Sequence, residues 1–140
     1  MKKLILPLLG LWILAALFIF YPEFKTRNFM DAFITSPENV EEVVQGINIR
    51  KDGGIVAILK PTDEKYDEVL AELRSWEVKK AMFKDMDYSQ EIVELDIMTD
   101  GKQLNSFHMA ITNNGMIDIR GKEYELVDGS SIEEIIEVVK

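Results

Sequence analysis

The chain has 140 residues, no cysteine, one histidine and a formal net charge of -9 at pH 7, a length that suits one modest domain with an appendage. The absence of cysteine excludes thiol nucleophiles, disulfides, thiolate metal sites and the lipidated cysteine of a bacterial lipoprotein. Residues 31–140 carry 12 basic and 24 acidic side chains, and because such a surface repels phosphate backbones we expect no nucleic-acid partner.

The first feature in chain order is an uncharged run of 18 residues, 4–21, which directly follows two lysines. As a helix it would be about 27 Å long, close to the hydrocarbon thickness of a bilayer. Tyr21 ends the run, and Lys25 and Arg27 lie just beyond it, as is typical of a membrane–water interface. The run therefore predicts a transmembrane helix.

Three interpretations of this run compete. A cleaved signal peptide needs small residues before the cut, but the sequence after the apolar run reads FIFYPEFKTRNF. A core helix of a soluble protein would need a larger domain to surround it. We therefore expect residues 1–21 to form an uncleaved signal anchor, with the lipid bilayer as the partner of residues 4–21. The tighter amino-terminal basic cluster favours a cytoplasmic amino terminus and a body outside the cell membrane.

Residues 22–39 mix phenylalanines with charges and two prolines. We expect a juxtamembrane linker here, the alternative being a segment that lies on the membrane surface. For residues 37–45 the pattern leaves helix and strand open, since valines at helical spacing are also β-branched. Domain organisation is then an anchor at 1–21, a linker at 22–39 and an extracytoplasmic α+β domain at 40–140.

The body begins with a predicted hairpin at 46–60, where INIR and IVAIL flank a KDGG turn. TDEKYDEVLAELRSW, residues 62–76, reads as a helix whose apolar stripe extends to Trp76, a residue of the core or its rim. Residues 77–90 are less regular: VKKAMF is a candidate short strand and KDMDYSQ a candidate loop.

From residue 91 apolar residues alternate in four successive segments, which predicts a four-stranded antiparallel meander. The segments are EIVELDIMT, LNSFHMAIT, MIDIR and KEYELV, with turns at DG 100–101, NNG 113–115 and GK 121–122. SSIEEIIEVVK closes the chain as an amphipathic helix, with a capping box available from Ser130 and Glu133 or from Ser131 and Glu134. The expected fold is α+β: a transmembrane helix, then a mainly antiparallel sheet, made of the hairpin plus the meander, covered by two helices.

This order of elements resembles a loose group of small bacterial envelope domains of unknown function, found behind a single anchor or a lipoprotein signal. INIRKDGGIVAIL, a helix ending in RSW, ITNNGMIDIRGKEYELVD and SSIEEIIEVV carry the resemblance over roughly residues 40–140. The resemblance implies an extracytoplasmic location and supplies no catalytic residues. Unlike the lipoprotein members, this chain has no cysteine.

Candidate chemistry is sparse, and we expect no catalytic residues, no resident metal and no cofactor. Strand alternation turns His108, the only histidine, to the outer face, away from Phe107 and Met109. Acids near residue 90 have a faint calcium-loop spacing, with Gln90 where the loop needs glycine. These weak cation candidates are Asp85, Asp87, Ser89, Glu91 and Asp96.

The sequence thus favours a membrane-anchored extracytoplasmic binding or interaction module of unknown specificity, whose partner is another envelope protein bound at a sheet edge or on an uncovered sheet face. The alternative is a cation or small-ligand sensor that uses the acidic segment 85–96. An enzyme is disfavoured because no GxSxG, HExxH or GxxxxGK motif is present.

Overall fold

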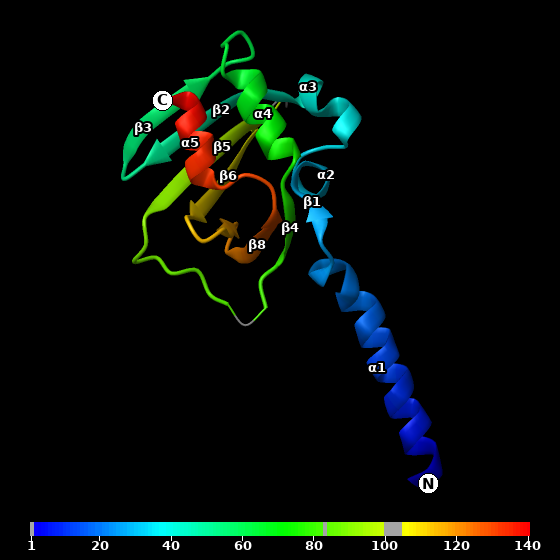
Figure 1. Cartoon of the computed structure of the whole chain (residues 1–140). Coiled ribbons are helices and arrows are strands. Elements are labelled where there is room, and N and C mark those ends of the chain that lie inside the picture. Colours follow the sequence, from blue (N-terminus) through cyan, green and yellow to red (C-terminus); the bar gives the residue numbers. More distant parts are fainter. Residues whose placement is uncertain (1, 83, 100–104) are drawn as a thin grey trace.

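A long helix, α1, runs away from an α+β body in the computed structural model, which describes residues 2–82, 84–99 and 105–140 (Figure 1). The helices are α1 (Lys2–Phe24), α2 (Phe29–Phe33), the 3-10 turn η1 (Pro37–Asn39), α3 (Val40–Val43), α4 (Tyr66–Arg74) and α5 (Ile132–Val139). The strands are β1 (Arg27–Asn28), β2 (Val44–Lys51), β3 (Gly54–Leu59), β4 (Glu77–Lys80), β5 (Ile92–Thr99), β6 (Asn105–Thr112), β7 (Met116–Ile119) and β8 (Lys122–Asp128).

The eight strands form one antiparallel sheet in the order β1-β4-β8-β7-β6-β5-β2-β3. The predicted α+β class, the β2–β3 hairpin and the β5 to β8 meander are confirmed. Three long-range pairings complete the sheet: β2 joins the hairpin to the meander through β5, β4 extends the sheet beyond β8, and β1 pairs with β4. Eight strands form instead of six, because β4 and the two-residue β1 add to the other edge.

Tight turns fix the register of the hairpins. Asp52 (φ 52°) and Gly53 (φ 76°) both have positive φ, which is the two-residue type I′ turn whose twist matches that of its strands. Arg120 and Gly121 repeat this conformation between β7 and β8. The turn is therefore 120–121, one residue before the predicted 121–122, since residue 122 already pairs in β8. The predicted turn at 100–101 lies outside the described residues.

One face of the sheet carries the core, and α4 and α5 lie side by side over it (Figure 1). The alternate residues of each strand point into this layer, among them Ile49 of β2 and Leu95 of β5, both fully buried. Trp76 follows α4 and is fully buried, which confirms the expected core position. Its indole Nε1 donates a hydrogen bond of 2.9 Å to the carbonyl of Ser130.

Residues 27–39 belong to the body, so the linker expected over 22–39 is shorter than predicted. Phe29 and Met30 of α2 are 0% and 1% exposed, and the Phe29 ring lies 5.7 Å from that of Trp76. Burial of α2 under the sheet edge is a tertiary effect that the local sequence pattern does not encode. For residues 37–45, where the sequence leaves helix and strand open, the structure contains both. The helical turns η1 and α3 come first, and strand β2 begins at Val44.

The last helix, α5, begins with one of the two predicted capping boxes. Ser131 Oγ accepts from the backbone N–H of Glu134, and the Glu134 carboxylate accepts from the backbone N–H of Ser131. The hydroxyl of Ser130 instead donates to the Glu72 carboxylate of α4. The two helices that cover the core are therefore tied together at this end of α5.

Candidate functional site

No helix of the described residues lies over the face of the sheet opposite α4 and α5, and this face presents a patterned set of side chains. Because residues paired across antiparallel strands point to the same side, two rows run across the sheet. The first row is Ile58, Asn48, Asp96 and His108, and the second is Ile55, Arg50, Glu94, Ala110 and Asp118. We call the part of this surface on β3, β2, β5 and β6 the open face, and define it by Asn48, Arg50, Ile55, Ile58, Glu94, Asp96 and His108.

A charge cluster occupies the middle of the open face. The Nη2 of Arg50 lies 3.2 Å from Asp96 Oδ2 and 3.4 Å from Glu94 Oε2. On the other side, His108 Nδ1 lies 2.6 Å from Asp96 Oδ1. The predicted outward position of His108 is thus observed, and the imidazole contacts a carboxylate. Because all four groups stand on paired strands, their geometry is fixed before any partner arrives.

An apolar strip flanks this cluster on the edge strand β3. Ile55 and Ile58 are 67% and 54% exposed, and Gly54–Leu59 contains neither a charged residue nor proline. Proteins usually protect a sheet edge with charge, proline or a covering segment, because its unpaired backbone groups accept a further strand. β3 therefore has neither the charge nor the proline that usually protects an edge strand. The strand at the other edge of the sheet, β1, is only two residues long.

The opposite end of the same sheet face is covered by residues 84–91, part of the connection between β4 and β5. Tyr88 Oη donates to Asp118 Oδ2 of β7 at 2.5 Å, and this hydrogen bond raises the pKa of Tyr88. Lys84 Nζ lies 3.5 Å from Glu125 Oε1 of β8. Met86 is buried beneath the segment although it lies outside the main core cluster. The freely accessible part of the sheet face is therefore the open face.

The five weak cation candidates have four different surroundings. Asp87 accepts hydrogen bonds from the hydroxyl and backbone N–H of Ser89, which hold the pKa of Asp87 below its usual value. Glu91 is paired with Lys51 at 3.0 Å, and Asp96 belongs to the open face. Asp85 lies beside Lys84, near the β6–β7 turn. Within residues 2–82, 84–99 and 105–140 no three histidine or carboxylate side chains converge on a point that could hold a metal ion.

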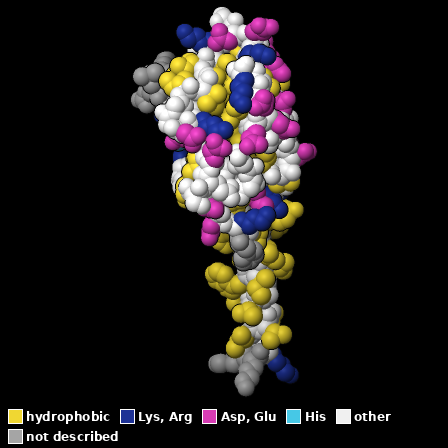
Figure 2. Space-filling view, turned by 60° about the vertical axis from the view of Figure 1, so that its left-hand side comes forward, with side chains coloured by type: hydrophobic (Ala, Val, Ile, Leu, Met, Phe, Trp, Pro, Cys, Tyr) yellow, Lys and Arg dark blue, Asp and Glu magenta, His cyan; other side chains and the backbone are white. Residues whose placement is uncertain are grey.

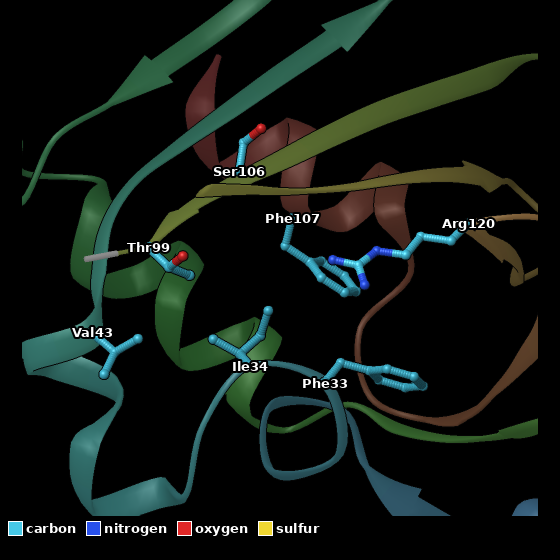
Figure 3. Close-up of a pocket in the computed structure, with 7 residues that line it drawn as sticks. All are labelled: Phe33, Ile34, Val43, Thr99, Ser106, Phe107 and Arg120. Atoms are coloured by element: carbon cyan, nitrogen blue, oxygen red, sulfur yellow. The ribbon is translucent and has the colours of Figure 1, made fainter. Parts of the chain in front are cut away.

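A separate hollow of about 380 Å³ lies beside α2 (Figure 3). Its lining consists of Phe33, Ile34, Val43, Thr99, Ser106, Phe107 and Arg120. The guanidinium of Arg120 lies 6.0 Å from the centre of the Phe107 ring, and Phe33 stands below that pair (Figure 3). Arg120 is the one titratable side chain among these lining residues, so they contain no acid–base or nucleophile–base pair.

Comparisons of the chain with protein-family profiles, with curated proteins and with solved structures gave no significant match. The class of protein is therefore defined by the fold alone: a small α+β body with an eight-stranded antiparallel sheet behind an apolar helix. The resemblance to bacterial envelope domains stays an expectation.

The sequence pattern predicts His108 only as an outward-facing residue and Asp96 only as a weak cation candidate, and it does not single out Arg50 or the exposed isoleucines of β3. The sequence pattern that could have indicated Arg50 is its alternation with Ile49 in INIR, which places Arg50 on the solvent-exposed face of the sheet. Its contact with Asp96 spans 46 residues and depends on the β2–β5 register, which local patterns do not determine.

Proposed function

We propose that this chain is a membrane-anchored extracytoplasmic interaction module, without catalytic chemistry of its own, that binds an envelope protein through its open face and the adjoining edge strand β3. The observation that carries the proposal is the combination of an exposed apolar edge strand, which has neither charge nor proline, with a fixed charge cluster beside it. The sequence supports the outside location of the body through the tighter amino-terminal basic cluster.

Support for anchoring comes from α1. Its segment Lys3–Tyr21 has a mean hydropathy of 2.5 and is 0% buried against the rest of the chain. Hydrophobic side chains line the visible side of the helix, whereas the body shows many acidic side chains on the same view (Figure 2). Trp12 and Phe18, at 71% and 87% exposed, would face water in a soluble chain, so a lipid environment is strongly favoured.

The chemistry of the open face indicates the kind of partner segment that fits. An extended strand added to β3 would pair with its free backbone groups, as in other edge-strand complexes. Its side chains toward the open face would meet Ile55 and Ile58 of β3 first, and Asn48 and Arg50 of β2 separate these isoleucines from the carboxylates of β5. A segment that is aliphatic at alternate positions, those on the side of the open face, therefore fits this edge.

The test is site-specific photocrosslinking of the full chain in its native membrane. A photoreactive residue at Ile58 is expected to trap one defined envelope protein, and the same residue at Glu68, exposed on α4, is expected to trap none. Ile55→Lys, which places a charge on the edge, should abolish the product at position 58 while leaving the circular dichroism spectrum unchanged. A product at position 68 alone, or one that survives Ile55→Lys, would contradict the proposal.

A further inference from the structure

Two segments that lie far apart in the sequence meet where α1 enters the body. The antiparallel pairing of β1 with β4 sets Arg27 opposite Val78 and Asn28 opposite Glu77. Continued by two residues, this register brings Lys25 near Lys80. The end of α1 contacts β4 at the same place.

These two segments carry most of their charge as cations. Residues 24–28 (FKTRN) and 77–84 (EVKKAMFK) together contain five basic side chains and one acid, Glu77, although residues 31–140 as a whole have twice as many acids as bases. We call the five the basic collar: Lys25, Arg27, Lys79, Lys80 and Lys84, of which Lys84 is also paired with Glu125 of β8 at 3.5 Å. Figure 2 shows basic side chains at the junction between the body and the apolar helix.

Aromatic rings hold part of the basic collar in place. Lys80 Nζ lies 5.6 Å from the centre of the Phe24 ring, and the guanidinium carbon of Arg27 lies 5.6 Å from that of Phe33. Lys25 is exposed, and neither it nor Arg27 forms an ion pair with a carboxylate of the described part of the chain. Cations fixed beside aromatic rings at the end of an apolar helix are typical of side chains at the membrane–water interface.

We infer that the basic collar is a binding surface for the anionic headgroups of phospholipids, which seats the body on the membrane beside its own anchor. Two observations carry this. The collar lies where the apolar helix α1 meets the body, through the contacts of α1 with β4 and of Phe24 with Lys80, and its charge is complementary to an anionic bilayer. Because the chain is otherwise acidic, the collar also decides which end of the body approaches an anionic surface.

This inference depends on the membrane anchoring proposed above but not on the open face. Binding of the basic collar to headgroups would hold the body in one orientation relative to the bilayer. The edge strand β3 would then have the fixed position that a partner in the same membrane requires. The collar and the open face are separate surfaces, so each can be altered without the other.

The absence of cysteine allows one label to be placed uniquely. We would attach a fluorophore at Met82→Cys, between Lys80 and Lys84 and 49% exposed in the parent, in the full chain reconstituted in nanodiscs. The discs contain phosphatidylcholine alone or with about 30% phosphatidylglycerol, plus a lipid that carries a quencher on its headgroup. Quenching at position 82 is expected to rise about twofold or more with phosphatidylglycerol and to return to the neutral-disc value in about 1 M salt, where the screening length is about 3 Å.

Matched variants assign the effect to the basic collar. A triple variant of the collar should remove the dependence of the quenching at position 82 on phosphatidylglycerol. It combines Lys25→Gln, Lys79→Gln and Lys84→Gln. The control combines Lys60→Gln, Lys65→Gln and Lys140→Gln, which changes the net charge equally at the other end of the body and should leave the dependence intact. A label at Thr62→Cys should show no quenching in either disc.

Equal quenching at position 82 in both kinds of disc would overturn the inference, because the tether alone would then explain the proximity. So would the absence of quenching in both. If inorganic phosphate releases the label more effectively than chloride at equal ionic strength, the collar is a site for free phosphate and the lipid assignment is wrong. The crosslink at Ile58 tests the open face independently, so a failure of either proposal is recognisable.

Discussion

Trp76 and Ser130, 54 residues apart, are joined by a hydrogen bond of 2.9 Å from the indole Nε1 to the Ser130 carbonyl. This contact connects the residue that follows α4 to the residue that precedes the cap of α5, directly above the sheet. Because the indole is fully buried, both its ring and its N–H contribute to the stability of the body.

Trp76→Phe is expected to lower the free energy of unfolding by about 2–4 kcal/mol, since it leaves the Ser130 carbonyl without this donor and empties part of the ring's space. Urea unfolding of the full chain in detergent, followed by circular dichroism, measures the change. The chain offers a matched control in Trp12 of α1, which is 71% exposed. Trp12→Phe should leave the unfolding midpoint of the body unchanged, and an equal loss in both variants would refute the assigned role.

Gly129 adopts a φ of +112°, and a Cβ there would lie 2.6 Å from Trp76 Cδ1. Gly129→Ala therefore combines a disfavoured backbone conformation with a clash, and we expect it to cost about 3 kcal/mol or more of the free energy of unfolding. Gly121 has φ +81° and nothing near its Cβ position, so Gly121→Ala measures the backbone cost alone, about 1–2 kcal/mol. Equal losses in the two alanine variants would show that the clash with Trp76 does not exist.

Lys51 and Glu91 join the end of β2 to the start of β5 at 3.0 Å. The hydrogen bond from Lys51 lowers the pKa of Glu91 from its ordinary value of 4.5. A lowered folded-state pKa stabilises the fold above the unfolded-state value, and this contribution is lost as the pH falls through the folded-state pKa. Carbon-detected NMR titration should show the Glu91 pKa returning toward 4.5 in Lys51→Gln. An unchanged pKa in that variant would mean that the pair is absent in solution.

Phe29 tests whether residues 27–39 are part of the body. Its ring is fully buried and lies within 6 Å, centre to centre, of the rings of Trp76 and Phe107. Phe29→Ala should therefore cost about 3–5 kcal/mol of the free energy of unfolding, as core phenylalanines do. Phe24→Ala, at a ring that is 36% exposed, should cost less than about 1 kcal/mol. If Phe29→Ala were equally mild, the segment would be a tether after all.

The regular half of the fold could be predicted because its signals are local. Alternation fixed the faces of β5 to β8, a KDGG turn fixed the first hairpin, and a serine followed three residues later by glutamate marked the start of α5. These features depend on neighbours in the sequence, and each is present in the structure.

The remainder depends on partners far away in the sequence. The phenylalanines of residues 24–33 show no helical stripe, and the burial of Phe29 is decided by Trp76 and Phe107, which the sheet brings to it. β4 is short and pairs with β8, some 45 residues later, so no local pattern reveals its place. The same holds for the candidate site, where alternation predicted the outward direction of His108 but only the sheet register places Arg50 against Asp96.

The proposed function requires that α1 stays on the chain as its membrane anchor. Intact mass measurement of the chain in carbonate-washed membranes tests this requirement. Membrane pellets should contain the full 16.1 kDa polypeptide, with residues 1–21 still attached. Recovery of the chain in the soluble fraction, or of a shorter form that begins after Phe20, would contradict the account.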